Sequence, residues 1–218
     1  MNEHSLHSEI KNWCSRLGDR FEARVGNFIV DIARGDLLIE IQTKNFYAIK
    51  LKLASLIRNH QVRLVYPIPE AKWIVTITES NEIVRRRRSP RKGKLADLFY
   101  ELVSIPTLFN ESNFSMEVLM IDEEEVRCDD GKGSWRRRGL SIRDRRLIDV
   151  KERFHFGSKE HFLRFLPSNL GETFTNRNLG TANQVSLNLA RKISYCLEKM
   201  GTIRKVGKRG RALVFQAN

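Results

Sequence analysis

Residues 30–46, VDIARGDLLIEIQTKNF, place polar side chains inside two apolar runs of the kind that form β-strands. Asp31 lies in the first run, and Glu40 and Gln42 lie in the second. A buried carboxylate is costly unless it is paired with a cation or holds a metal ion. The stretch is therefore either part of a metal site or a surface hairpin whose acids are solvated, and both alternatives stay open at this point.

Strand geometry brings some of these side chains together. Side chains alternate between the two faces of a strand, so Glu40, Gln42 and Lys44 point one way. The tight Arg34-Gly35-Asp36 turn pairs the two strands, so the Asp31 carboxylate reaches Glu40 only if the strands are offset or diverge. Carboxylates on neighbouring strands suit Mg²⁺, which binds one or two of them and keeps several waters. Such an ion activates water and stabilises charge on a scissile phosphate.

The flanking sequence predicts the order of the surrounding elements. A helix is expected over residues 8–17, and two strands, over residues 21–25 and within residues 27–33, are joined by a Gly26-Asn27 turn. After the strand that carries Glu40, Asn45 is suited to cap a helix whose apolar face includes Phe46. Two more strands are expected over residues 62–68 and 72–78. The core order is helix, three strands, helix, strand.

This order, with Asp31 followed nine positions later by Glu40 and then Gln42, resembles the restriction-endonuclease-like superfamily of PD-(D/E)xK nucleases over about residues 5–78. The resemblance implies an α/β fold with an α-β-β-β-α-β core. It implies that Asp31 and Glu40 hold Mg²⁺, or Mn²⁺ in its place. Val30 stands where the motif has Pro, and Gln42 stands where most members have a Lys that polarises the attacking water. A Gln can orient water but brings no positive charge.

The resemblance also extends to side chains outside the motif. Lys44 or Lys50 is the candidate for the missing cation, and Lys44 joins the expected catalytic set. Glu9, on the first helix, matches the place of an additional acidic ligand, with Glu22 on the first strand as a rival. The expected catalytic residues are Asp31, Glu40, Gln42 and Lys44, and the expected metal ligands are Asp31, Glu40 and Glu9.

The charge of the chain indicates a polyanionic partner. The formal net charge is +13, and residues 81–218 carry 28 Lys and Arg against 17 Asp and Glu. Three basic clusters account for much of this excess: residues 85–94, 135–146 and 204–211. Basic side chains that neutralise phosphates release condensed counterions, so DNA is the expected partner. A solvated charged surface and a protein partner for the basic segments stay open as alternatives.

The last sixty residues change character. Helices are predicted over residues 158–167, after Thr175 as a cap, and from Ser186 to Gly201, and two strands follow around a basic turn. This order is similar to that of winged helix-turn-helix DNA-binding domains, in which the last helix enters the major groove and the wing follows the backbone. The alternative is a winged helix that contacts proteins. The residues expected to bind DNA are Asn188, Arg191, Lys192, Lys205, Lys208, Arg209 and Arg211.

Together these patterns predict a nuclease-like domain with basic extensions over residues 1–157 and a winged-helix domain over residues 158–218. The expected function is Mg²⁺-dependent hydrolysis of DNA. The rival is a DNA-binding regulator or repair accessory that keeps the nuclease fold without activity, and an RNA-processing nuclease is a weaker alternative. No apolar run is long enough to span a membrane and no secretory signal is recognisable, so a cytoplasmic protein is expected. A homodimer stays open.

Overall fold

The computed structural model describes residues 5–218, and its core is a mixed α/β arrangement. Strands β1, β2 and β3 form an antiparallel meander, and β3 then pairs in parallel with β4. The predicted order of helix, three strands, helix, strand is confirmed. These elements are α1 Ser5–Cys14, β1 Arg20–Val25, β2 Phe28–Arg34, β3 Leu37–Ile41, α2 Phe46–Leu56 and β4 Gln61–Ile77.

The two helices cover opposite faces of this sheet. Leu6 and Ile10 of α1 pack on Ile32 and Ile39, whereas Leu53 of α2 belongs to a second and larger cluster on the other face. The predicted helix over residues 8–17 starts and ends too late, because the chain leaves the helix after Cys14 and Leu17 is fully exposed. A hydrogen bond from the Arg16 amide to Asp19 Oδ2 holds the turn that follows α1.

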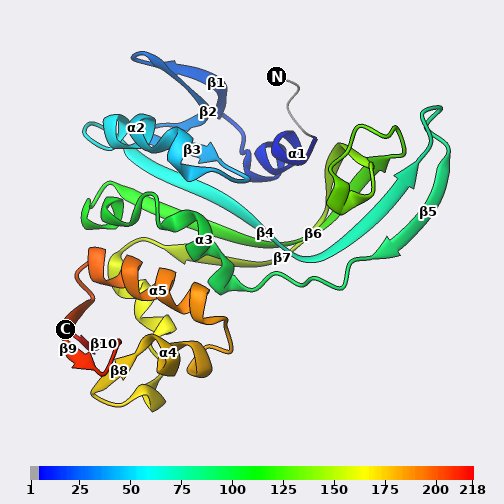
Figure 1. Cartoon of the computed structure of the whole chain (residues 1–218). Helices are drawn as coiled ribbons and strands as arrows, with labels where there is room; N and C mark the ends of the chain where they lie inside the picture. Colours follow the sequence, from blue (N-terminus) through cyan, green and yellow to red (C-terminus); the bar gives the residue numbers. More distant parts are fainter. Residues whose placement is uncertain (1–4) are drawn as a thin grey trace.

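The sheet continues through unusually long strands (Figure 1). The two strands predicted over residues 62–68 and 72–78 are one strand, β4, because a register shift between Pro69 and Ala71 absorbs the irregularity. β4 pairs in parallel with β6, and β6 pairs antiparallel with β7. The short strand β5 pairs only with the far end of β4. These elements are β5 Ile83–Arg88, β6 Phe114–Cys128 and β7 Ser141–Phe156.

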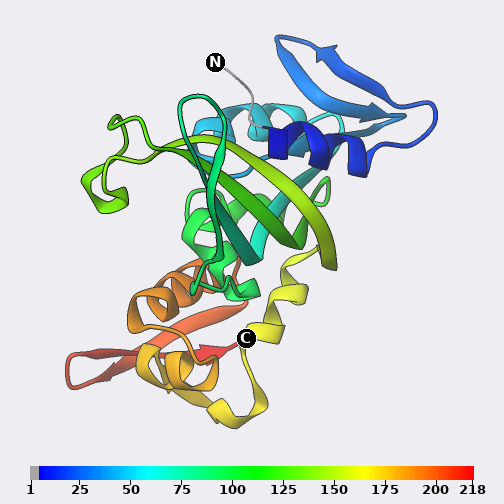
Figure 2. The ribbon, with the colours of Figure 1, turned by 90° about the vertical axis from the view of Figure 1, so that its right-hand side faces the viewer.

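The far ends of these strands extend beyond the two helices as an arm, which we define as residues 72–88 and 122–146 (Figures 1 and 2). The Arg-rich hairpin expected at residues 81–94 therefore contributes one edge of the arm. The basic loop expected after residue 128 joins β6 to β7 and contains a short 3₁₀ turn, Trp135–Arg137. A small apolar cluster of Val75, Ile77, Val126 and Cys128 lies within the arm.

The C-terminal segment forms a three-stranded sheet, ordered β8-β10-β9, against two helices. Both predicted caps are confirmed: the Thr175 hydroxyl accepts a hydrogen bond from the Asn178 amide, and the Ser186 hydroxyl accepts one from the Leu189 amide. The helix predicted over residues 158–167 is instead a 3₁₀ helix, Lys159–Phe165. The other elements are β8 Thr173–Thr175, α4 Asn176–Ala182, α5 Leu187–Lys199, β9 Ile203–Arg209 and β10 Ala212–Ala217.

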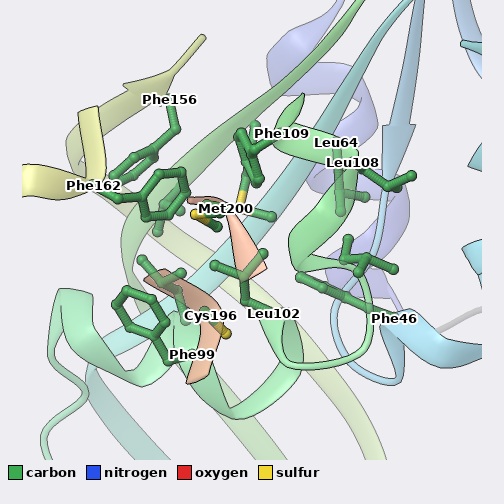
Figure 3. Packing of buried hydrophobic residues seen from close by; sticks show 14 of the residues in the cluster. Phe46, Leu64, Phe99, Leu102, Leu108, Phe109, Phe156, Phe162, Cys196 and Met200 are labelled. Carbon is green, nitrogen blue, oxygen red and sulfur yellow. The ribbon is translucent and has the colours of Figure 1, made fainter. Parts of the chain in front are cut away.

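One hydrophobic core joins the C-terminal segment to the rest of the chain (Figure 3). Phe162 lies with its ring centroid 4.6 Å from that of Phe109 and also 4.6 Å from that of Phe156. Cys196 and Met200 of α5 are buried in the same cluster, which reaches Leu53 of α2. Residues 158–218 are therefore fused to the sheet through shared apolar packing. The predicted domain boundary near residue 157 therefore separates two differently folded parts that share one hydrophobic core.

Candidate functional site

The site predicted from residues 30–46 lies where β2 and β3 separate. The register between the two strands runs from Arg34 opposite Leu37 to Ile32 opposite Ile39 and stops there. Beyond that point the Asp31 side chain bridges the strands, because its Oδ2 accepts a hydrogen bond of 2.7 Å from the Ile41 amide. The next pair in this register would be Asp31 opposite Glu40, so, contrary to the expectation from the tight turn, no offset or divergence is needed to bring the two residues together.

Glu40 is a buried carboxylate with one free oxygen. Its side chain is 8 % exposed, and the ammonium of Lys52, on α2, donates a hydrogen bond to Oε1. Oε2 is buried and accepts no hydrogen bond among the residues that the structure describes. Burial and the negative charge of Asp31 together raise the pKa of Glu40 to about 7, against the opposing effect of Lys52. A cation bound to Oε2 would supply the partner that this carboxylate oxygen lacks among the described residues.

The pKa of Asp31 is shifted in the opposite direction, downward. Burial acts to raise its pKa, but hydrogen bonds from His7 and from the Ile41 amide outweigh burial and hold the pKa below its ordinary value. His7 lies on α1, with Nε2 at 3.3 Å from Asp31 Oδ2 and at 3.0 Å from the Ile41 carbonyl oxygen. Because the two carboxyls interact, they titrate as a pair, and Asp31 is the member that keeps its charge more firmly.

The other predicted site residues lie apart from this pair. Gln42 is half-buried, and its Nε2 donates to the backbone oxygens of Lys44, at 2.5 Å, and Asn45, at 3.3 Å. The Lys44 side chain is exposed. Glu9 turns toward β7, where its Oε2 accepts a hydrogen bond from the Leu147 amide. Within residues 5–218, no three His, Cys, Asp or Glu side chains gather as a metal-binding group, so Asp31 and Glu40 stand as a pair.

Two side chains at the site were missed in the sequence, His7 and Lys52, which contact the carboxylates directly. Glu22, the rival acid, pairs with Lys11 instead. Lys52 follows Ile49 by three positions and precedes Leu56 by four, which puts it at the margin of the apolar face of α2. That spacing is the signal that could have favoured Lys52 over Lys50, which is exposed.

The start of α2 is capped differently from the prediction. Asn45 was expected to cap the helix with its side chain, but it has a φ of 59° and makes no such hydrogen bond. The Glu101 carboxylate caps the helix from a distant part of the sequence, because its Oε2 accepts from the amides of Asn45, at 2.8 Å, and Phe46, at 3.3 Å. A carboxylate at a helix N-terminus also interacts favourably with the helix dipole.

A cleft of about 510 Å³ opens directly beyond Gln42. Thr43 and Lys44 line it on one side, and the stretch of β4 that begins at Tyr66 also lines it. Buried acids and basic side chains from the base of the arm, among them Glu125 and Arg145, line its far side. The end of the strand that carries Glu40 is thus connected to a polar cleft large enough for part of a polar ligand.

Comparison with known proteins places the chain in a family. Residues 4–157 match the model of a family described as a domain of unknown function, DUF8091. The chain belongs to the DUF8091 family. An uncharacterized protein of Treponema pallidum (strain Nichols) is 28% identical over 216 residues, which cover 98% of this chain and 85% of that protein. No solved structure matches. The DUF8091 match thus includes the Asp31–Glu40 pair and the arm, and the Treponema relative aligns with the C-terminal segment as well.

The segment beyond the DUF8091 match has a basic hollow of its own. A cavity of about 620 Å³ lies between the starts of α4 and α5 and the turn that joins β9 to β10. Four arginines line it: Arg177, Arg191, Arg209 and Arg211. Asn188 and Lys208 are exposed. The structure therefore brings together basic residues from the helix and from the strands that the sequence placed 18 or more positions apart.

Two of the predicted DNA-binding lysines are engaged within the protein. Lys192 is half-buried, and its ammonium lies 5.8 Å from the centre of the Tyr100 ring. Lys205 forms an ion pair of 3.0 Å with Glu198. In contrast, the contacts described for residues 5–218 include no acidic partner for Lys208, Arg209 or Arg211. Fewer of the predicted DNA-binding residues are therefore available to a ligand than the sequence indicates.

None of the helices in the described part of the chain combines the length and apolar character needed to cross a membrane.

Proposed function

We propose that this protein is a Mg²⁺-dependent DNA endonuclease that hydrolyses phosphodiester bonds and is targeted by a winged-helix segment. The observation that carries the proposal is the Glu40 carboxylate, which is buried beside Asp31 with one oxygen lacking any hydrogen-bond partner. A buried carboxylate in that condition costs stability. A metal ion bound by this oxygen would explain why a glutamate occupies position 40.

The residues present fit a magnesium ion. Mg²⁺ prefers oxygen ligands, often one or two carboxylates together with waters, and Asp31 and Glu40 supply such a pair at the point where β2 and β3 diverge. When bound there, the ion would supply an activated water and would offset charge on the phosphate. The order of the elements and the Asp31, Glu40 and Gln42 spacing support the same assignment through resemblance to the PD-(D/E)xK nucleases.

Lys52 takes the place of the missing motif lysine in this proposal. Its ammonium binds Glu40 from α2, whereas Lys44 and Lys50 are exposed and Gln42 is uncharged. Because the Lys52 side chain is mostly buried, its charge acts in a medium of lower dielectric than water. Lys52 is therefore the group suited to stabilise negative charge near Glu40. Gln42, fixed by the backbone oxygens of Lys44 and Asn45, orients the loop at the mouth of the cleft.

The C-terminal segment supports the DNA-targeting part of the proposal. Helices α4 and α5, followed by a β9–β10 hairpin that pairs with β8, have the order of a winged helix-turn-helix. Asn188 and Arg191 are exposed at the start of α5 and are suited to base edges. Lys208, Arg209 and Arg211 on the hairpin are suited to phosphates, which fix affinity more than sequence preference.

A non-catalytic DNA-binding protein is the second candidate, and one specific observation favours it. Lys52 and His7 already contact Glu40 and Asp31, so each carboxylate has a side-chain partner without any metal ion. In this alternative the carboxylates are structural and the protein acts as a regulator or repair accessory.

The experiment that separates the two candidates is nicking of supercoiled plasmid in Mg²⁺ or Mn²⁺, with EDTA as the blank. The nuclease proposal expects cleavage by the unmodified protein and by Gln42→Lys, which restores a positive charge, and no cleavage by Glu40→Gln. Equal cleavage by the unmodified protein and by Glu40→Gln would assign the activity elsewhere. Absence of cleavage of single-stranded, duplex and branched DNA, with no change in melting temperature on addition of Mg²⁺, would favour the non-catalytic candidate.

A further inference from the structure

Two basic clusters that are far apart in the sequence become parts of one surface. Residues 85–88 lie on β5, and residues 136–138 and 143–146 lie in and after the loop between β6 and β7. β5 pairs with β4, β4 with β6, and β6 with β7, so all of them belong to the far end of the same sheet. Figures 1 and 2 show this arm projecting beyond α2, whereas α1 contacts its base, where Ser5 donates hydrogen bonds to Asp144.

The acids of the arm are mostly used within the protein. Residues 72–88 and 122–146 contain 13 Lys and Arg against nine Asp and Glu. Glu123 and Glu125 are buried, and Glu124, Asp130 and Asp144 form ion pairs with Arg86, Arg143 and Arg146. The excess positive charge is therefore left at the surface of the arm.

Several other arginines are exposed at both edges of the arm, although the Arg88 guanidinium also lies 5.3 Å from the centre of the Trp73 ring. Every residue of β5 is exposed, and within residues 5–218 no ion pair is described for Arg85, Arg87 or Arg88. Arg136 and Arg138 are exposed on the opposite side. Arginine is the residue best matched to phosphate, because its planar fork donates two parallel hydrogen bonds to two oxygens.

An exposed aromatic ring lies among these arginines. The Trp135 side chain is 83% exposed, and the Arg136 guanidinium lies 5.5 Å from its ring centre. Trp135 therefore presents an uncovered aromatic face at the surface of the arm. Aromatic rings of this kind serve as stacking platforms for unpaired bases in proteins that bind single strands.

We infer that the arm is a second nucleic-acid-binding surface, on which exposed arginines contact the phosphates and Trp135 stacks on an unpaired base. The preferred ligand is single-stranded nucleic acid or a duplex with an unpaired segment. The inference rests on the proposed function only in taking nucleic acid as the partner, and it requires no cleavage.

Position and chemistry favour nucleic acid over an anionic membrane. The arginines run along the length of the arm and do not surround one apolar face, as a membrane-bound element would require. The base of the arm also lines the cleft that opens beyond Gln42, through Lys72, Arg127 and Arg145. A strand held on the arm would therefore reach the cleft that Thr43 and Lys44 line, at the end of the segment that carries Glu40.

The arm and the winged-helix hairpin lie at well separated places in both views of the molecule (Figures 1 and 2). The two surfaces can therefore contribute independently to binding, and substitutions on one should leave the contribution of the other intact. This independence makes the arm testable without disturbing the hairpin.

The test is fluorescence anisotropy of labelled oligo-dT and of a labelled duplex with the full chain in EDTA, between about 50 and 200 mM salt. The arm variant is Arg85→Gln, Arg87→Gln and Arg88→Gln together, which spares the Glu124 pair of Arg86. Its matched control is Arg16→Gln, Arg20→Gln and Arg58→Gln, three exposed cations outside the arm and the hairpin. Trp135→Ala is compared with Trp135→Phe, which keeps a stacking ring.

The arm variant is expected to lower the salt dependence of binding by about 0.7 for each lost phosphate contact on a single strand, while the control leaves it unchanged. Trp135→Ala should weaken oligo-dT binding about fivefold or more and Trp135→Phe by less, with little effect on the duplex. The inference is overturned if the arm variant binds as tightly as the unmodified protein, or if the control loses as much. The inference would also be overturned, in favour of a membrane surface, if the arm variant bound nucleic acid as the unmodified protein does but no longer bound vesicles of anionic lipid. If the arm variant behaves as expected but no cleavage is found, only the nuclease proposal fails.

Discussion

The Lys52 ammonium binds one oxygen of Glu40 and leaves the other oxygen of the same carboxylate buried without a partner. Lys52 also donates to the Ile29 carbonyl oxygen, so it ties α2 to the end of β2 as well as to β3. The contact is thus both a structural link and a source of positive charge beside an acid whose pKa is raised. Several measurable properties depend on this relationship.

Glu40→Gln should stabilise the metal-free protein at alkaline pH. The pKa of Glu40 in the folded state, about 7, is above its ordinary value, so the fold favours the protonated acid. The stability due to this protonation is present below the ordinary pKa and is lost as pH rises through about 7. Gln cannot ionise, so the variant should melt higher by about 2–5 °C at pH 8 and by little at pH 5.

Magnesium should reverse this order. A ligand that binds only the folded state raises the melting temperature, so Mg²⁺ at pH 8 should stabilise the unmodified protein and leave Glu40→Gln unchanged. Melting curves in EDTA and in Mg²⁺ measure both effects. Equal shifts in the two proteins would show that the ion binds elsewhere.

Lys52→Met should reduce DNA cleavage far more than Lys44→Met. Lys52 contacts Glu40, whereas Lys44 is exposed at the mouth of the cleft. Removal of one preorganised charge from a site typically lowers the rate by about 100-fold, and Met keeps most of the apolar length of the side chain. Plasmid cleavage rates, with circular dichroism to verify folding, test the comparison. Similar losses in the two variants would remove Lys52 from the proposed mechanism.

Glu125→Ala should destabilise the base of the arm. The buried Glu125 pairs with Lys72 at 3.3 Å, Arg127 at 2.7 Å and Arg145 at 3.2 Å, which tie β4, β6 and β7 together. Its removal leaves three cations without their shared acid, at a cost of about 3–5 kcal/mol in the free energy of unfolding. Glu124→Ala, which breaks one half-exposed pair, is the control and should cost about 1 kcal/mol or less.

Glu125 should also make the stability of the protein depend on pH in the acidic range. Burial acts to raise the pKa of Glu125, but Lys72, Arg127 and Arg145 outweigh it and lower the pKa. Its stabilising effect is therefore present above the ordinary pKa of a glutamate and is lost as pH falls through the lowered value. Urea unfolding at a series of acidic pH values should show a smaller loss of stability in Glu125→Ala than in the unmodified protein. Parallel losses would show that Glu125 titrates normally.

Lys208→Gln, Arg209→Gln and Arg211→Gln together should weaken binding of the full chain to duplex DNA. Each lost phosphate contact lowers the salt dependence of the binding constant by about 0.9. Lys192→Gln with Lys205→Gln is the comparison, because those lysines are engaged by Tyr100 and Glu198 and should contribute little. The reverse ranking of the two variants would show that the ligand binds the opposite face of α5.

The sequence predicted those features that depend on neighbouring residues. The alternation along one strand identified Glu40 and Gln42, and local capping patterns identified Thr175 and Ser186. The spacing of Asp31 was sufficient to select it, although the bond to the Ile41 amide depends on how two strands diverge. These signals are short-range, so one sequence is enough to recognise them.

Features that depend on packing between distant elements were not predicted. The contacts of His7 and Lys52 are set by how α1 and α2 are rotated over the sheet, and Glu101 caps α2 from more than fifty residues away. The arm requires parallel pairing of β4 with β6 across a long connection, which no local pattern specifies. The packing of Cys196 of α5 into the core shared with the sheet likewise depends on residues far away in the sequence.

That shared core has a geometric consequence. Phe162, Cys196 and Met200 pack the C-terminal segment onto the sheet, so the basic hairpin and Glu40 belong to one packed unit. If the proposed function holds, a DNA bound by the hairpin would present a fixed stretch of its backbone to the carboxylates. The cuts would then fall at a fixed number of nucleotides from the bound site.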